Sequence, residues 1–550
     1  MPYSFFVLAL IVSLLAHKSY AATQPDAGQL LRDTLQQPPA PFERDLNLEI
    51  LTEPLIESTH GGTSVPLSKV VFEGNTVFSD AVLAGLLGDL TDNLYDLAAM
   101  RALANDITRY YREHGYPFAR AYLPAQRLAD GQLVIALLEG RYGQVTATGE
   151  LAEQVQPFLN ALKPGDIIYS PTLERVALLI ADLPGISIIP IIQPGAETGA
   201  ADFILQATPA KQYSGLVNID NHGNRFTGDT RLIGNLNWSR LLLLGDQLSV
   251  SGMTTDEQMF FGSVNYQFPI RYEGLRGELS YVRTDYQLAK DFSALDATGQ
   301  AEITTISASY PILRSQNANL SLVTSLQFKR FNDKVGVIDS DKIKTATVLP
   351  IALNFDKRDQ IGLGGITYGS AIFTWGNLNI RDSEDRFNDR LTAQTHGQFQ
   401  KVNLDVARIQ AFNQAWSGFL RLNSQWAKDN LDSAEKMSIG GARAVRAYPI
   451  GEGSADRAAL LQLEIRYQLD PAWTPYGFID AAKTQINANP FDQNQPSNSR
   501  EYSGGGLGIR YNHQPWRGEL IAAWRWGGGL PQADTRDDVP RVWANISYQF

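Results

Sequence analysis

The chain has 550 residues, a formal net charge of -11 and a pI of about 5.2, so no broad basic surface points to nucleic acid as a partner. It contains no cysteine, which excludes disulfides, thiolate zinc sites and cysteine nucleophiles. At roughly 150 residues per domain, the length predicts three or four units, or fewer if one large barrel takes up much of the chain.

Residues 1–21 are predicted to be a secretory signal peptide. An apolar run over residues 5–16 is followed by a polar stretch that ends in Ser19-Tyr20-Ala21, which fits a secretory cleavage signal. No Lys or Arg precedes the run, and an uncleaved anchor is the alternative, but a spanning helix needs about 20 residues. No later stretch is apolar enough to span as a helix, so a mature chain in a membrane would have to be a barrel.

Residues 22–37 are predicted to hold one short helix, with Leu30, Leu31 and Leu35 on one side. A helix this short is marginal in water, so it needs a surface to dock against. Residues 38–66 are rich in proline and include a Gly-Gly pair, which is typical of an extended linker.

Residues 67–141 and 142–210 are predicted to form two α+β modules, each with the order strand, helix, helix, strand, strand. The first reads "LSKVVFEGN", "SDAVLAGLLGDL", "DLAAMRALANDITRYYREHGY", "PFARAYLPAQ" and "GQLVIALLEG". The second reads "YGQVTATGE", "LAEQVQPFLNAL", "SPTLERVALLIADLPG", "ISIIPIIQ" and "ADFILQAT". One mixed domain with chance internal similarity is the alternative.

Residues 211–550 change to the alternation of apolar and polar side chains that is typical of strands. In the last stretch, "RVWANISYQF", the apolar residues share one face: Val542, Ala544, Ile546, Tyr548 and Phe550. The same split recurs in "SVNYQFPI" and "ALLQLEIRYQL". This periodicity fits either a soluble sandwich or a membrane barrel whose apolar face meets lipid.

Three features favour the barrel. About sixteen strands are expected, and longer polar connections at 285–300, 380–392, 429–458 and 483–501 alternate with tight ones. Aromatic residues recur near the ends of the apolar faces, as interfacial girdles do: Trp238, Tyr272, Trp416, Trp473, Trp516 and Trp526. The chain stops directly after an amphipathic strand, the kind of terminus that bacterial barrels present to their assembly machinery. Its predicted signal residues are Ile546, Tyr548 and Phe550.

In this order of elements the chain resembles an outer-membrane transporter of the two-partner secretion (TpsB) family, the ShlB/FhaC/HecB-like branch of the BamA-related superfamily. The stretches "YYREHGYPFARAYLPAQ" and "GQLVIALLEGRYG" are similar to the family's first POTRA domain, and "LERVALLIADLPGI" to a helix of its second. "FQKVNLDVARIQ" resembles the tenth strand. The resemblance implies a mainly β protein, in which a lumen plug helix and two α+β POTRA domains precede a 16-stranded transmembrane β-barrel.

The glycine-rich stretch "GGARAVRAYPIGEGSAD" resembles the tip of the family's long sixth extracellular loop, which folds back into the barrel lumen. The family's Val-Arg-Gly-aromatic signature here reads Val445-Arg446-Ala447-Tyr448. Ala447 replaces the expected glycine, and alanine adopts a positive φ only at a cost. The alanine therefore puts the family's exact tip conformation in question, although Arg446 keeps its place in the signature.

The resemblance also implies a partner for Arg446 on the thirteenth strand, in "TPYGFIDAA". Alternation puts Phe478 and Asp480 on one face, and the charge of Asp480 assigns that face to the lumen. Because a desolvated guanidinium without a partner is costly, we expect a charge-assisted Arg446–Asp480 pair, with Phe478 beside it and Glu464 as a second acidic candidate. The alternative is a solvated loop in which the arginine pairs with nothing.

The function implied by the resemblance is export of a large, mostly unfolded exoprotein, such as an adhesin or haemolysin, across the bacterial outer membrane. Its POTRA domains would recognise the exoprotein in the periplasm, where "PFARAYLPAQ" and "ISIIPIIQ" are candidate docking edges, if they are not ordinary core strands. Other implied partners are outer-membrane lipid and, during biogenesis, the barrel assembly machinery and periplasmic chaperones.

No enzyme site is predicted. The chain has no P-loop, no H-E-x-x-H and no G-x-S-x-G, and its six histidines are dispersed, so we expect no catalytic residue, metal ligand set or cofactor. Two rival functions remain. An assembly factor for other outer-membrane proteins would usually have more POTRA domains, and a plain porin would need neither the two modules nor the arginine loop.

Overall fold

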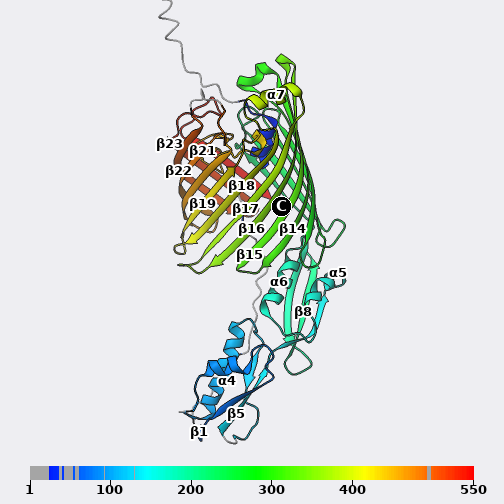
Figure 1. The fold of residues 1–550 in the computed structure, drawn as a ribbon, viewed down its shortest axis with the longest axis vertical. Coiled ribbons are helices and arrows are strands. Elements are labelled where there is room, and N and C mark those ends of the chain that lie inside the picture. The colour runs from blue at the N-terminus through cyan, green and yellow to red at the C-terminus, as the bar shows by residue number, and fades with distance from the viewer. Residues whose placement is uncertain are drawn as a thin grey trace, which may run out of the picture.

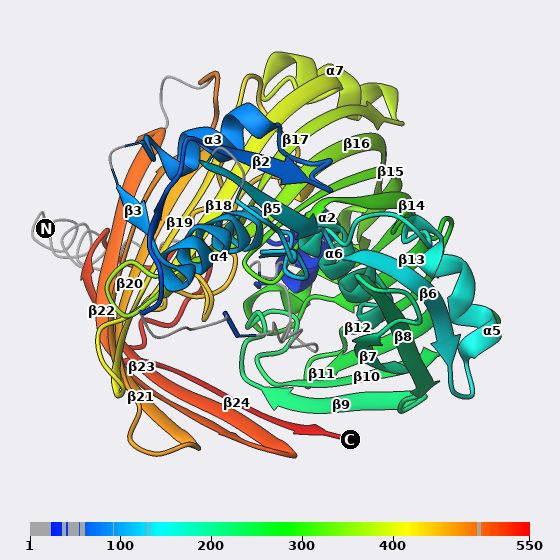
Figure 2. The same ribbon diagram turned by 90° about the horizontal axis from the view of Figure 1, so that it is seen from below.

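The computed structural model describes residues 24–35, 40–41, 54–55, 61–91, 93–128, 131–491 and 497–550. Two small α+β modules lie below a closed barrel, and the short helix α2 (Ala27–Leu35) lies inside the barrel (Figures 1 and 2). The predicted signal peptide falls outside the described residues, as does most of the predicted linker. None of the described helices is both long and apolar enough to cross a bilayer.

Sixteen antiparallel strands close the barrel, which confirms the predicted strand number. In chain order they are β9 (Tyr213–Asp220), β10 (Arg231–Ser239), β11 (Gln247–Thr255), β12 (Phe260–Pro269), β13 (Arg276–Gln287), β14 (Ala297–Arg314), β15 (Ala318–Val335), β16 (Ser340–Asp359), β17 (Gly365–Ile380), β18 (Gly397–Ala411), β19 (Trp416–Ala427), β20 (Arg457–Tyr467), β21 (Trp473–Gln485), β22 (Ser499–His513), β23 (Trp516–Gly527) and β24 (Arg541–Gln549). The closing contact joins β24 to β9 over five residue pairs.

The strands differ in length around the barrel. β14, β15 and β16 have 18, 18 and 20 residues, whereas β9 has only 8. We call the end of the barrel that faces the modules the proximal end and the opposite end the distal end. Paired residues continue into the distal connection predicted at 285–300, where Gln300 bonds Asp285 at 2.9 Å, so the unpaired part shrinks to 288–296. The connection predicted at 380–392 contains a helix, α7 (Ser383–Leu391), because Asp382 caps its first turn.

Side chains alternate between an apolar outer face and a polar lumen. On β24, Val542 and Ile546 are 48% and 52% exposed, whereas Arg541 and Trp543 point inward and are buried. The outward residues are those that a membrane barrel presents to lipid. The apolar residues therefore face outward and the polar residues face the lumen, as the sequence predicted for a membrane barrel.

Aromatic residues pair across neighbouring strands at the proximal end, where a girdle was expected. The pairs have ring centroids 4.7–5.5 Å apart and are Tyr213–Trp238, Trp416–Tyr467, Trp473–Tyr511 and Trp516–Tyr548. Trp526 lies at the distal end of β23 and is 60% exposed. Tyr272 departs from the girdle, because it lies in the turn after β12 and its ring meets Phe158 of the second module at 4.9 Å.

The first module contains a three-stranded sheet of order β2-β5-β4. Its elements are β1 (Val65–Pro66), β2 (Lys69–Glu73), α3 (Asp80–Leu87), β3 (Leu94–Tyr95), α4 (Leu97–Glu113), β4 (Arg120–Tyr122) and β5 (Gln132–Leu138). The helices pack on the sheet through fully buried residues that include Leu83, Ile107 and Ile135. β4 is left as one edge of this sheet.

The second module contains a sheet of order β6-β8-β7, with β7 at an edge. Its elements are β6 (Arg141–Thr148), α5 (Ala152–Val155), η2 (Gln156–Ala161), α6 (Ser170–Ala181), β7 (Ile186–Pro194) and β8 (Ala200–Pro209). The helix predicted over "LAEQVQPFLNAL" is divided into a short α-helix and a 3₁₀ turn. Pro157 explains the division, since it lacks the N–H that would continue the α-helical ladder.

The second module is fixed to the proximal end of the barrel. Arg314, at the end of β14, donates from Nε and Nη2 to the two carboxylate oxygens of Asp182 at 2.7 and 2.6 Å. The turn after β10 packs closely on the same module, because a Cβ at Gly245 would lie 2.7 Å from Leu183. A bidentate charged contact of this kind fixes orientation as well as distance.

A buried carboxylate organises the first module. Glu139 is 4% exposed and accepts hydrogen bonds from the backbone N–H of Thr76 at 2.6 Å and of Val77 at 2.8 Å, as well as from the Thr76 hydroxyl. The Tyr111 hydroxyl donates a further bond of 3.0 Å. Burial raises the pKa of the Glu139 carboxyl, but these hydrogen bonds outweigh burial and hold that pKa below its ordinary value.

Replacing Glu139 with Gln is expected to destabilise the first module by about 1.5–3 kcal/mol at neutral pH, because bonds to a charged acceptor are lost. The folded-state pKa is lowered, so the contribution is complete above the unfolded pKa of about 4.3 and is lost as the pH falls through the folded value. The difference should therefore fade in acid. Limited proteolysis of the purified protein against temperature measures it, with the exposed Glu113→Gln as control. Equal protease resistance of the two variants at pH 7 would contradict this role.

Candidate functional site

The connection between β19 and β20, residues 428–456, turns back into the lumen; we call it the long loop. Most of its residues from Met437 to Pro449 are buried. Two glycines permit the sharp path: a Cβ at Gly440 would lie 2.0 Å from a backbone oxygen, and Gly441 has a φ of +109°. The loop therefore packs on the inner wall rather than standing in solvent.

Arg446 is 2% exposed and contacts the wall through every part of its guanidinium. Its Nε and Nη2 donate to the two oxygens of Asp480 at 2.8 and 2.7 Å, and its backbone N–H donates to the same carboxylate at 3.0 Å. Nη1 donates to Glu464 at 2.6 Å, and the guanidinium carbon lies 3.6 Å from the centre of the Phe478 ring. The structure thus brings together the four residues that the sequence grouped.

The arginine belongs to a wider charged network along β20 to β23. Glu464 also accepts from Arg466 at 2.8 Å and from Arg510 at 3.0 and 3.2 Å. Arg510 in turn donates to Glu519 at 2.7 Å. Three arginines thus face three carboxylates, Asp480 included, so the cluster is formally neutral. Neutrality offsets much of the desolvation cost that buried charges incur.

The rest of the signature anchors the loop by shape and by one hydroxyl. Val445 and Tyr448 are fully buried, and the Tyr448 hydroxyl donates to the backbone oxygen of Gly527 at 2.5 Å. Ala447 is not among the described non-glycine residues with positive φ, so the expected cost of replacing glycine does not arise. Its methyl group packs against Gly504 of β22, where an added Cβ would lie only 2.5 Å from the Cβ of Ala447.

Trp543 also contacts the signature, and the sequence did not predict this contact. Its indole N–H donates to the backbone oxygen of Arg446 at 2.7 Å, although 97 residues separate the two in the chain. The available signal was alternation, since Trp543 shares a face with Arg541 and Asn545 in the last strand. Arg510, which follows the glycine run of β22, was missed in the same way.

The plug helix α2 rests on the long loop. Arg32 Nη1 donates to the backbone oxygens of Ser433 and Lys436 at 2.7 and 3.0 Å, and the Ser433 hydroxyl donates to Asp26 at 2.5 Å. Where the two segments cross, a Cβ at Gly28 would lie 2.7 Å from the Cβ of Ala434. Helix and loop therefore occupy the lumen together, in direct contact (Figure 2).

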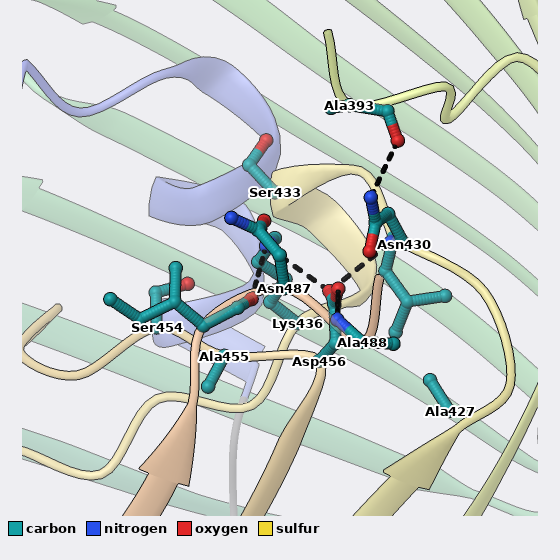
Figure 3. A network of polar contacts seen from close by, with 12 residues as sticks. Ala393, Ala427, Asn430, Ser433, Lys436, Ser454, Ala455, Asp456, Asn487 and Ala488 are labelled. Atoms are coloured by element: carbon teal, nitrogen blue, oxygen red, sulfur yellow. Dashed lines mark hydrogen bonds and ion pairs between the residues drawn. The ribbon is translucent and has the colours of Figure 1, made fainter. Parts of the chain in front are cut away.

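A second buried carboxylate fastens the base of the long loop to the connection after β21 (Figure 3). Asp456 is 0% exposed and accepts from the backbone N–H groups of Leu431 and Ala488 at 3.0 and 2.8 Å. Lys436 pairs with it at 3.1 Å. Asn430 donates at 2.8 Å each to the backbone oxygen of Asn489, in the same connection after β21, and to that of Ala393, in the connection between β17 and β18. Both ends of the loop are thus held at the distal end.

The predicted C-terminal signal residues lie on the outer face of the barrel. Ile546, Tyr548 and Phe550 are 52%, 39% and 47% exposed. Phe550 follows β24 but stays in the ladder, since it exchanges two 3.0 Å backbone bonds with Gly215. These residues are therefore separate from the lumenal cluster.

Residues 199–511 match the family model described as haemolysin secretion/activation protein ShlB/FhaC/HecB, and residues 65–140 match the ShlB-type POTRA domain. The chain is 28% identical to the heme/hemopexin transporter protein HuxB of Haemophilus influenzae over 483 residues, which cover 85% of this chain and 84% of the relative. Its fold is similar to that of CdiB from Escherichia coli, with a TM-score of 0.73, 20% identity, and coverage of 100% of this chain and 99% of that chain. BamA from Haemophilus ducreyi lacking POTRA domains 1–3 gives a TM-score of 0.51 at 11% identity, covering 88% of this chain and 100% of that chain, a likeness of fold alone.

Proposed function

The chain belongs to the haemolysin secretion/activation family ShlB/FhaC/HecB, which makes it an outer-membrane transporter of the two-partner secretion type, and we propose here which of its parts receive and pass the exoprotein. The barrel lies in the outer membrane and the POTRA region in the periplasm. The proximal end is therefore the periplasmic end, and the distal end is extracellular.

The exoprotein first docks, in this proposal, as an extended segment on the first module. A cavity of about 790 Å³ lies between α4 and β4. Its lining is mixed: polar groups lie beside the apolar side chains of Leu97, Met100, Tyr122, Leu123 and Leu128. The edge strand β4 forms one wall of the cavity, so a docked segment can add backbone hydrogen bonds to apolar contacts.

The edge strand β7 of the second module is the next docking point. Ile189 and Ile191 are 57% and 39% exposed there. Pro190 between them has no N–H, so backbone pairing along β7 is interrupted and the apolar contacts carry more of the binding. This difference supports the first module as the site of initial recognition.

Passage requires the lumen to clear, because α2 and the long loop fill it together. The Arg446 cluster holds the loop to the wall formed by β20 to β23, while Asp456 holds its base at the extracellular end. The loop is thus fixed at two points, and α2 is the part that leaves. We assign the loss of contact between α2 and the long loop as the step that opens the channel.

Biogenesis involves the outer face rather than the lumen. Ile546, Tyr548 and Phe550 present an apolar edge next to the closing strand β9, which suits recognition by the barrel assembly machinery after periplasmic chaperones deliver the chain. The outward apolar residues then meet outer-membrane lipid. We assign no enzymatic activity to the chain.

The cavity of the first module, with its apolar side chains, carries this proposal, and Leu97→Asp tests it. Leu97 lines the cavity and is 52% exposed, so the change spares the core but removes about 1.5–3 kcal/mol of apolar contact with the exoprotein. We expect exoprotein in the medium to fall by at least about tenfold. Leu94→Asp, at a position 68% exposed and outside the cavity lining, is the matched control.

Equal secretion by the two variants would contradict docking at this cavity. A fall in unrelated outer-membrane proteins when the transporter is deleted, with secretion of the exoprotein unchanged, would instead indicate an assembly factor. The relation to BamA is one of fold, so it does not favour that outcome.

A further inference from the structure

A cavity of about 590 Å³ lies between the second module and the barrel, away from both the lumen and the first module. Its barrel side is formed by Tyr310 and Ile312 of β14, and its module side by Phe158, Val176 and Leu179. Cavities of this volume accommodate small ligands or the head and upper chain of a lipid.

This cavity opens on the outer surface of the barrel wall. Ala301 and Ile303 of β14 pack against α2 in the lumen, so side chains of the opposite parity point outward. Ile306 and Tyr310 have that parity and are 52% and 39% exposed. Viewed along the barrel axis, α5 lies beyond the outline of the barrel (Figure 2). The second module therefore extends under the ring of lipid around the barrel, and the cavity continues the lipid-facing surface.

Three charged side chains line this cavity, and one of them, Arg314, is already paired with Asp182. The other two are Arg175 and Glu273. Arg175 makes one short bond, from Nη2 to the backbone oxygen of Pro311 at 2.7 Å, and weaker contacts at 3.4 and 3.5 Å. Its guanidinium carbon lies 5.9 Å from the centre of the Tyr310 ring. Glu273 is exposed, and within the described ranges its carboxylate takes part in no hydrogen bond or ion pair. A cation and a free anion thus meet beside apolar walls.

We propose that this cavity binds one zwitterionic phospholipid of the periplasmic leaflet, with a phosphate and a primary ammonium in its headgroup. The phosphate binds the remaining donors of Arg175, and the ammonium pairs with Glu273. The upper acyl chain lies along Phe158, Leu179 and Ile312, where it removes apolar surface from water. The lipid then fills the junction between the module and the membrane, so the membrane itself takes part in orienting the module.

Native mass spectrometry of the full-length transporter, reconstituted in defined vesicles and gently extracted, tests this proposal. Wild type should retain one phosphatidylethanolamine at least tenfold in preference to phosphatidylglycerol, which lacks the ammonium. Arg175→Gln should lower retention of phosphatidylethanolamine about tenfold, as expected for loss of a charged hydrogen bond. Glu273→Gln should remove the preference between the two lipids, and Ala161→Trp, which fills the cavity, should remove retention of both.

Arg271→Gln is the matched control, because this exposed arginine lies in the same turn as Glu273 but does not line the cavity. It should leave retention unchanged. The proposal is overturned if retention survives Ala161→Trp, if wild type retains phosphatidylglycerol equally well, or if millimolar inorganic phosphate displaces the lipid as a free anion would. It is also overturned if the site is occupied by the exoprotein, seen as a cross-link from a photoreactive residue at position 161.

Discussion

Replacing Arg446 with Ala is expected to cut secretion of the partner exoprotein at least tenfold while the barrel still assembles. The change leaves the carboxylates of Asp480 and Glu464 buried without their shared partner, and removing one member of a buried charged cluster costs about 3–5 kcal/mol. The long loop then loses its attachment to the wall and obstructs the lumen. Exoprotein in the medium measures secretion, and heat-modifiable migration checks the barrel.

The matched control is Arg443→Ala, three residues earlier in the same loop, where the side chain is exposed in the lumen. It should secrete near the wild-type level. Arg446→Lys keeps the charge but lacks the planar fork, so it should fall between the two. Secretion by Arg446→Ala equal to that of the control would refute a role for the cluster in transport.

A single methyl group on the plug helix is expected to open the channel. In Gly28→Ala the new Cβ would lie 2.7 Å from the Cβ of Ala434, too close for two carbon atoms. Overpacking of this kind costs about 1–3 kcal/mol, which shifts the plug between bound and released states roughly five- to more than a hundredfold. Planar-bilayer recordings should show more frequent and longer openings.

The double variant Gly28→Ala with Ala434→Gly supplies the control, because it removes the opposing Cβ, the closest contact, and leaves only the Cα and N of residue 434 at 3.1 Å. It should bring the openings back toward the wild-type level. If the double variant stays as open as Gly28→Ala, the methyl group acts through helix propensity or the unfolded chain rather than through this contact.

Alternation and family resemblance together were enough to group Arg446 with Asp480, Glu464 and Phe478, because both strands that carry the partners have a plain apolar face. The contacts of Trp543 and Arg510 with the cluster could not be predicted. They depend on the register in which strands late in the chain pair with one another as the barrel closes. Register follows from pairing and turn geometry across the whole sheet, which no local pattern states.

The elements of the modules were predicted well where hydrophobic periodicity was strong, as over α4. The prediction was wrong where a single residue interrupts the backbone hydrogen bonding of a helix, as Pro157 does between α5 and η2. The barrel connections were drawn too long at 285–300 and 483–501 because polar residues there still pair in the ladder. In such strands the change to polar residues marks where the strand leaves the membrane, but the backbone pairing between strands continues beyond that point.

The unequal strand lengths make the extracellular opening slope. A strand needs about 9–11 residues to cross the bilayer, so β9, with 8 residues, falls just short of that length, whereas β14 to β16 exceed it by roughly eight residues. At about 3.3 Å per residue and the usual tilt, that wall stands about 20 Å higher, with α7 at its top (Figure 1). A polypeptide that leaves the lumen therefore meets a tall screen on one side and open membrane surface on the other, and it is released sideways over the low wall beside β9.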